Sequence, residues 1–178
     1  MTSRIEKGAP EIMAKKAKSA LATPTDLSSN SAMSVADALN GILADSFALY
    51  FKTKNFHWHV SGPHFRDYHL LMDDQAAQIL ATTDVIAERV RKTGNTTLRS
   101  VGDIARRQSI KDNDADFVSA QDMLKELRDD NLALVAKLRE AKDIVDAAKD
   151  NATSGILDEW TDQAEERAWF LFETARNA

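Results

Sequence analysis

The chain has 178 residues and a net charge of −5, the size of one globular domain or of a domain with a tail. Its 43% hydrophobic and 29% charged residues exclude a fibrous or disordered chain, and the absence of cysteine excludes disulfide scaffolds, thiolate metal sites and cysteine nucleophiles. No apolar run is long enough to span a bilayer, and the first 30 residues lack the apolar core of a signal peptide. The expected location is therefore the cytoplasm, with no membrane partner.

The segment 1–31 differs in composition from the rest of the chain. Residues 1–20 carry five basic and two acidic side chains, whereas acidic side chains predominate in the remainder. Two prolines and a run of serine and asparagine at residues 28–31 leave this segment little to bury. We expect a flexible basic arm over residues 1–31 and a folded domain over residues 32–178. A tail that is merely solvated is the alternative.

Apolar residues of the domain recur every three or four positions, which is typical of helices packed against a core. The first helix is expected to begin at a cap on Ser31 or Ser34 and to end near residue 60, where a Ser-Gly-Pro sequence breaks it. The second helix is expected to follow this break and to end at Gly94, a residue type suited to a helix C-terminus.

Residues 95–118 form a long connection, in which the apolar stretch 101–110 indicates a short helix. A third long helix is expected from about Ser119 to a break at residues 150–151, and a fourth from about Thr153 to the end of the chain. The positions assigned to the apolar sides of the second and fourth helices include Phe65, Trp169 and Phe172.

This order of elements predicts an all-α fold. Two long helices, a long crossover and two further long helices are the connectivity of a ferritin-like four-helix bundle. The expected fold is that bundle, with a short helix in the connection between its second and third long helices. Few glycines and prolines, six and three in the whole chain, argue against a β-sandwich or barrel.

The four histidines, His57, His59, His64 and His69, all lie within one short stretch of the chain. Histidines gathered beside carboxylates are the composition of a site for a divalent transition metal. On the second helix, four potential ligands fall within about 100° of one another around the axis: His69, Asp73, Asp84 and Glu88. Carboxylates on one stripe with apolar residues are costly to bury unless they bind something, although a partly solvated stripe is the alternative.

Distances along the helix divide these ligands into two groups. His69 and Glu88 are about 28 Å apart along the axis, and Asp73 and Asp84 are about 16 Å apart, so one ion cannot join either pair within one chain. Both pairs have the same midpoint, between residues 78 and 79. Two antiparallel copies of the helix, related by a two-fold axis at that midpoint, would place each ligand beside its complement on the other copy.

The same helical geometry distinguishes the other histidines, some of which face the predicted ligands and some of which do not. His57 is about as far before the predicted turn as His69 is after it, so the two face each other across an antiparallel hairpin. His59 and His64 point in other directions and are expected to be surface or hydrogen-bonding residues. No glutamate is followed by histidine three residues later, so the usual metal motif of a ferritin-like bundle interior is absent and the site is expected at an interface.

Two sequence motifs resemble the signatures of a known family. The run Lys-Asn-Phe-His-Trp-His-Val-Ser-Gly-Pro-His-Phe-Arg-Asp-Tyr-His at residues 54–69 and the run Asp-Val-Ile-Ala-Glu-Arg at residues 84–89 look like the two signatures of the Dps family. The resemblance extends over residues 32–178, including the closing Trp-Phe-Leu at residues 169–171.

The resemblance implies a hollow dodecamer of ferritin-like subunits, near 236 kDa for chains of 19.7 kDa. It implies a two-iron site between two-fold-related subunits, at which Fe(II) is oxidised, preferably by hydrogen peroxide, before ferric mineral is stored in the cavity. By motif position, the iron ligands are His57, His69, Asp73, Asp84 and Glu88. Trp58 matches a tryptophan beside that site and could absorb a stray oxidising equivalent, with simple packing at the hairpin as the alternative.

The resemblance also implies DNA as a partner, because many members of the family compact DNA through a terminal arm that carries lysines. The arm residues available for sequence-independent phosphate contact are Arg4, Lys7, Lys15, Lys16 and Lys18. The alternatives are a structural protein of the nucleoid with the cage as scaffold, a small ferritin that does not bind DNA, and an inert helical oligomer. Candidate pore residues on the fourth helix are Asp158, Asp162 and Glu165.

Overall fold

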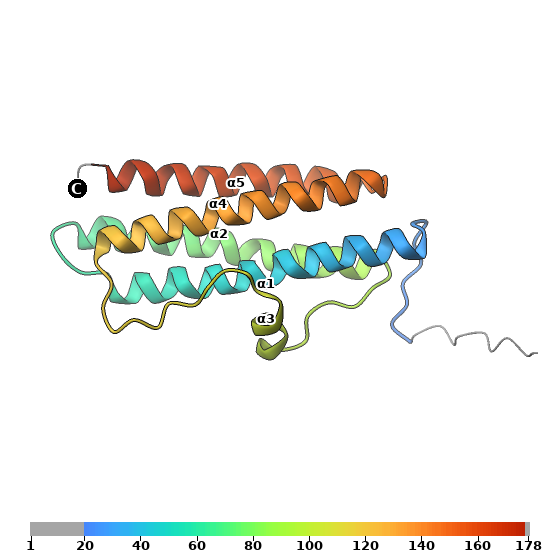
Figure 1. Ribbon diagram of the computed structural model, residues 1–178, viewed down its shortest axis with the longest axis horizontal. Coiled ribbons are helices and arrows are strands. Elements are labelled where there is room, and N and C mark those ends of the chain that lie inside the picture. The colour runs from blue at the N-terminus through green and yellow to red at the C-terminus, as the bar shows by residue number, and fades with distance from the viewer. Residues whose placement is uncertain (1–19, 177–178) are drawn as a thin grey trace, which may run out of the picture.

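The computed structural model describes residues 20–176, which contain five helices and no strand (Figure 1). The helices are α1 (Ser29–His59), α2 (Phe65–Lys92), α3 (Val101–Arg107), α4 (Ala120–Ala147) and α5 (Asn151–Ala175). The predicted all-α, ferritin-like four-helix bundle is confirmed, and so is the short helix in its long connection. Within residues 20–176, no helix combines the length and the hydropathy of a membrane span.

Two helical hairpins lie side by side in the bundle, α1 with α2 and α4 with α5 (Figure 1). The two hairpin turns are at opposite ends of the molecule, so the connection from α2 to α4 must run the length of the bundle. Figure 1 shows this connection passing beside α1, and α3 is the one helix that it contains between Lys92 and Ala120. This up-down-down-up path is the ferritin-like connectivity.

The start of α1 differs from the expectation. Its cap is Ser28, whose Oγ accepts a hydrogen bond from the backbone N–H of Ser31 at 3.2 Å, so neither Ser31 nor Ser34 is the cap. Several serines in this run could cap a helix, and the choice is made by packing: Ala32 is buried, and Asn95 Nδ2 donates to its carbonyl at 2.9 Å. The helix therefore begins inside the segment expected to be an arm.

The remaining helix ends follow from local chemistry. Ser100 and Ser119 cap α3 and α4 by accepting from the backbone N–H three residues on. Asp150 caps α5 in the same way, accepting from Thr153 N at 3.1 Å, so α5 begins two residues before the expected start. The turn between α4 and α5 is tight enough to hold Lys149 at a φ of 58°, in the left-handed region.

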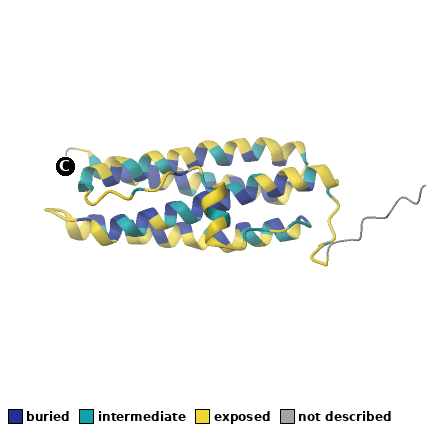
Figure 2. Ribbon diagram, turned by 60° about the horizontal axis from the view of Figure 1, so that its bottom comes forward, coloured by how far each residue is buried: buried dark blue, intermediate teal, exposed yellow. Residues whose placement is uncertain are grey.

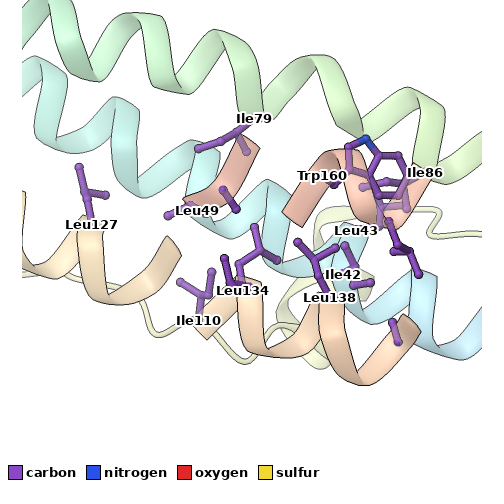
Figure 3. Close-up of a cluster of buried hydrophobic side chains, with 14 of the residues drawn as sticks. Ile42, Leu43, Leu49, Ile79, Ile86, Ile110, Leu127, Leu134, Leu138 and Trp160 are labelled. Carbon is purple, nitrogen blue, oxygen red and sulfur yellow. The ribbon is translucent and has the colours of Figure 1, made fainter. Parts of the chain in front are cut away.

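Buried apolar residues line the inward faces of the four long helices (Figure 2). Figure 3 shows their centre, where side chains of all four helices meet, and Ile110 of the long connection joins the same cluster. Burial of this kind contributes about 25 cal/mol for each Å² of apolar surface removed from water, and it is the main force that holds the bundle together.

Three residues assigned from periodicity to the apolar faces are exposed in the single chain, contrary to the expectation: Phe65, Trp169 and Phe172. Phe65 lies against the ring of His69, with centroids 5.1 Å apart, and Trp169 packs on Phe170. They lie at the margins of the helical faces, and the four-helix core is closed without them. A three- or four-residue period alone does not distinguish the centre of an apolar face from its edge.

The long connection is fastened to the bundle by one buried carboxylate. Asp45 on α1 is almost fully buried and accepts hydrogen bonds from Ser109 N at 2.5 Å, Ser109 Oγ at 2.7 Å and Ile110 N at 3.2 Å. Lys137 on α4 lies 2.5 Å from the same carboxylate. Asp45 therefore joins α1, α4 and the connection at one point, and every contact is charge-assisted.

Replacing Asp45 with alanine is expected to destabilise the chain by about 3 kcal/mol, because three donors and a lysine lose their buried acceptor together. For a chain of this size, that corresponds to a melting temperature lower by roughly 6–12 °C in a thermal denaturation experiment. Asp37→Ala is the matched control, since Asp37 also pairs with a basic side chain, that of Arg107, but is exposed. Equal melting temperatures for the two variants would contradict the role of Asp45.

Candidate metal centre

The closed end of the α1–α2 hairpin brings together two of the predicted ligands. The chain leaves α1 after His59, turns through Gly62, whose φ of 110° is in the region that favours glycine, and enters α2 at Phe65. This short turn sets the register of the two helices. Across it, the rings of His57 and His69 stack with centroids 3.7 Å apart, so their expected juxtaposition is confirmed.

Each of these histidines orients the other through its backbone. His57 Nδ1 donates to the carbonyl oxygen of His69 at 2.8 Å, and His69 Nδ1 donates to the carbonyl oxygen of His57 at 2.8 Å. A carbonyl can only accept, so both Nδ1 atoms carry the proton, and the uncharged form of each ring presents an unprotonated Nε2. This is the tautomer that a metal ion requires, held by the outer hydrogen bond that metal-binding histidines usually make.

Asp73 lies beside this pair, one turn of α2 after His69. Its Oδ1 is 3.9 Å from His57 Nε2 and 2.6 Å from the ammonium of Lys54 on α1. The hydrogen bond from Lys54 lowers the pKa of Asp73, helped by the charges of Lys54 and the two histidines and opposed by partial burial. The carboxylate is therefore ionised at neutral pH, as a metal ligand must be.

Lys54 is the residue of this cluster that the sequence analysis did not assign. It lies three residues before His57, which places the two side chains on the same face of α1. That spacing was the available signal, but a lysine among candidate metal ligands does not by itself indicate a role. The structure shows that Lys54 contacts the same carboxylate oxygen that approaches His57.

Trp58 lies next to this cluster and contacts it through Lys54. Its side chain is 56% exposed, its ring meets Phe51 edge to face at 6.1 Å, and the ammonium of Lys54 lies 5.9 Å from its centroid. Lys54 thus stands between Trp58 and Asp73. These contacts test neither expectation for Trp58, the absorption of a stray oxidising equivalent or simple packing at the hairpin.

His59 and His64 lie outside the cluster. His59 is exposed and its Nδ1 bonds the carbonyl of Asn55 at 2.7 Å, while His64 is exposed at the N-terminus of α2, against Tyr68. Both therefore occupy the surface and hydrogen-bonding positions that the helical geometry indicates.

Asp84 and Glu88 do not join the other ligands within the chain. Both are exposed on α2, and Glu88 accepts a hydrogen bond from Lys92 at 3.3 Å. From Asp73 to Asp84 the helix rises about 16 Å. Within residues 20–176, no three histidine or carboxylate side chains converge closely enough to enclose a metal ion. One chain thus presents the ligands as two separate groups on one continuous helix.

The end of α2 that carries the far group is anchored by Arg89, which the sequence analysis also did not assign. Its Nη2 donates to Asp150 Oδ1 at 2.6 Å and its Nε to Thr153 Oγ1 at 2.6 Å. These bonds tie the last turns of α2 to the α4–α5 turn. Despite the cost of burial, the arginine and Thr153 hold the pKa of Asp150 below its usual value.

The candidate pore residues and the predicted DNA-contacting residues are the two remaining sets. Of the candidate pore residues, Asp158 pairs with Lys142 and Glu165 pairs with Arg139. The five predicted DNA-contacting residues, from Arg4 to Lys18, lie outside the described residues. The chain that follows them crosses the end of α2, where Arg91 Nη2 donates to the carbonyl of Leu21 at 2.6 Å.

Comparisons with known proteins agree with this geometry. Residues 36–177 match the ferritin-like domain family, which is the class that the bundle and its crossover define. The "DNA protection during starvation protein" of Brevibacillus brevis is 33% identical over 137 residues, covering 77% of this chain and 91% of the relative. A low temperature-induced protein of Nostoc sp., all0458, is 36% identical over 138 residues, covering 77% of each chain.

Among solved structures, a Dps protein from Bacillus brevis superposes with a TM-score of 0.79 at 30% identity, covering 83% of this chain and 99% of that one. The chain belongs to the Dps family of ferritin-like proteins.

Lys54→Met is expected to bind a divalent cation more tightly, because the ammonium competes with the metal for Asp73 Oδ1. The gain should be about two- to fivefold, the size of an exposed ion pair. Titration of the assembled protein with cobalt(II), followed by calorimetry, measures it, and Lys125→Met, on the exposed side of α4, is the matched control. Weaker binding by Lys54→Met would show that the lysine positions the carboxylate rather than competing for it.

Proposed function

We propose that this protein oxidises Fe(II), mainly with hydrogen peroxide, at sites shared between two-fold-related chains, and that it stores the ferric product inside a shell of twelve chains. The observation that carries the proposal is the reciprocal pair of His57 and His69. Two imidazoles with their Nε2 atoms unprotonated, beside an ionised carboxylate, form half of a ligand set suited to iron.

The outer face of α2 supports completion of the set by a second chain. The helix spans Phe65–Lys92, so its own midpoint lies between residues 78 and 79, where the midpoints of both ligand pairs also fall. Near that point the exposed residues Ala77 and Ala81 are small, which permits close approach of two helices. An antiparallel copy across a two-fold axis would bring its Asp84 and Glu88 to the histidine end of the first chain. The same axis would bring Asp84 and Glu88 of the first chain to the histidine end of the copy, so that two equivalent sites form.

The residues present suit the chemistry of the reaction. Fe(II) is the substrate, and two ions can each give one electron to one molecule of hydrogen peroxide, which takes up two protons and leaves as two molecules of water. Collecting two ions at one place avoids one-electron reduction of peroxide and the hydroxyl radical that it releases. Asp73, Asp84 and Glu88 would offset the charge of the cations, and Trp58 is near enough to absorb a stray oxidising equivalent.

Sequence-independent DNA binding by the arm is a second proposal. It rests on the basic composition of residues 1–20 and on the names of the relatives as DNA protection proteins. Leu21, which Arg91 holds at the end of α2, fixes the point from which the arm departs. A single arm of small net charge would bind phosphate weakly, but several arms on one shell act together.

Iron oxidation is expected to be lost in His69→Ala and in Glu88→Ala and to return when the two variants are assembled together. In a mixed pair of chains, one of the two sites is intact, so random mixing restores about one quarter of the wild-type rate. Stopped-flow absorbance after anaerobic Fe(II) loading and peroxide addition measures the rate.

The control is a mixture of His57→Ala with His69→Ala. These two residues belong to the same half-site, so no combination of the two chains yields an intact site and no activity should return. Equal recovery of activity in both mixtures would refute the shared site. So would the absence of recovery in both mixtures, once native mass spectrometry has shown that the shells contain both variants.

Removal of residues 1–20 is expected to abolish a DNA gel shift at low salt and to leave iron oxidation unchanged. Phosphate contacts by lysines release counterions, so the shift given by the full chain should weaken steeply as salt rises. A variant with glutamine at Lys15, Lys16 and Lys18 keeps the length of the arm and tests its charge. DNA binding that survives both changes would place the contact on the body of the protein.

A further inference from the structure

Arg167 on α5 is buried in the centre of the four-helix bundle, with 4% of its surface exposed. Its Nε donates to Asn131 Oδ1 on α4 at 2.8 Å, and its carbonyl oxygen accepts from Gln75 Nε2 on α2 at 3.1 Å. Asn131 on α4 therefore holds the guanidinium, and Gln75 on α2 holds the backbone of the same residue.

This side chain has no ion-pair partner in the described part of the molecule. No carboxylate between residues 20 and 176 lies within ion-pair distance of Arg167, the charge of Glu166 acts on it only from farther away, and its buried Nη1 has no hydrogen-bond partner there. Burial lowers the pKa of Arg167 to about 10, which still leaves it charged at neutral pH. A buried charge without a partner is costly, so the site favours a group that supplies negative charge.

A small cavity of about 10 Å³ adjoins Arg167. All four long helices line it, and Figure 3 shows its apolar wall, formed by Ile42, Ile79, Ile86, Leu134, Leu138 and Trp160. The polar lining residues besides Arg167 are Ser46, Thr82 and Gln163. A space of this size admits one water molecule or one monatomic ion.

The polar lining can turn toward an anion. Ser46 Oγ donates to the carbonyl of Ile42 and Thr82 Oγ1 to that of Ile79. Helix N–H groups already satisfy those carbonyls, so rotating either hydroxyl toward a guest leaves no acceptor unpaired. A water molecule would satisfy Nη1 but would bring no negative charge to the guanidinium.

We propose that the cavity beside Arg167 binds one monatomic anion of the halide class, with chloride as its ordinary occupant. Thr82 and Gln163 are partly exposed, so the entry path lies between α2 and α5. Bound there, the anion links the packing of α5 against α2 and α4 to the chloride concentration.

Crystals of the full-length protein grown in bromide in place of chloride test the site directly. Anomalous scattering is expected to show one bromide within hydrogen-bond distance of the Arg167 guanidinium. Wild-type crystals without anomalous density in the cavity would overturn the proposal, because a water molecule or no guest would then fill it. This measurement needs no variant and so does not depend on how a substitution folds.

Thermal denaturation at constant ionic strength, with chloride replaced by gluconate, tests binding in solution. Above the dissociation constant, the melting temperature of the wild type should rise by about 4 °C for each tenfold increase in chloride. Arg167→Met should lose this dependence, and Arg139→Met, which removes an exposed arginine of α4, should keep it. A wild type that responds no more than Arg167→Met would also overturn the proposal.

Discussion

The reciprocal hydrogen bonds between His57 and His69 fix the register of α1 against α2, and the rest of the site depends on that register. Each ring is anchored to the backbone of the opposite helix, so a slip of one residue would break both bonds together. With the register fixed, Asp73 is one turn beyond His69, within reach of both His57 and Lys54. The outer face of α2 is then presented as a rigid surface over its whole length.

The bundle interior carries polar groups of a different kind. Lys52 is buried between α1 and α4, 2.8 Å from Glu126 and 2.6 Å from Asp130, and burial raises the pKa of Asp130 despite that partner. Near the middle, Arg167 adds a second buried cation. Both cations lie among the packed helices, and the lack of a Glu-x-x-His motif agrees with the prediction of a metal site at an interface between chains rather than inside the bundle.

Local sequence signals predicted most of the fold because they act over a few residues. The Ser-Gly-Pro break, the cap at Ser119 and the period of the apolar positions each depend on short-range sterics or hydrogen bonding. They failed where several residues satisfied the same local rule. Any of several serines could have begun α1, and contacts of Ala32 with the α2 end selected Ser28.

The sequence by itself determined the helices, the crossover and the common face of His69, Asp73, Asp84 and Glu88, because a helix converts spacing along the chain into angle and height. The similar distances of His57 and His69 from the predicted turn also predicted that the two residues would meet. Only the tertiary structure decided which nitrogen of each ring is free and that Lys54 contacts Asp73. It alone placed the buried guanidinium of Arg167, whose Nη1 has no hydrogen-bond partner among residues 20–176, beside a cavity. Those features arise where side chains distant in sequence meet, and their distances and hydrogen-bond partners depend on how the helices pack, which no local pattern encodes.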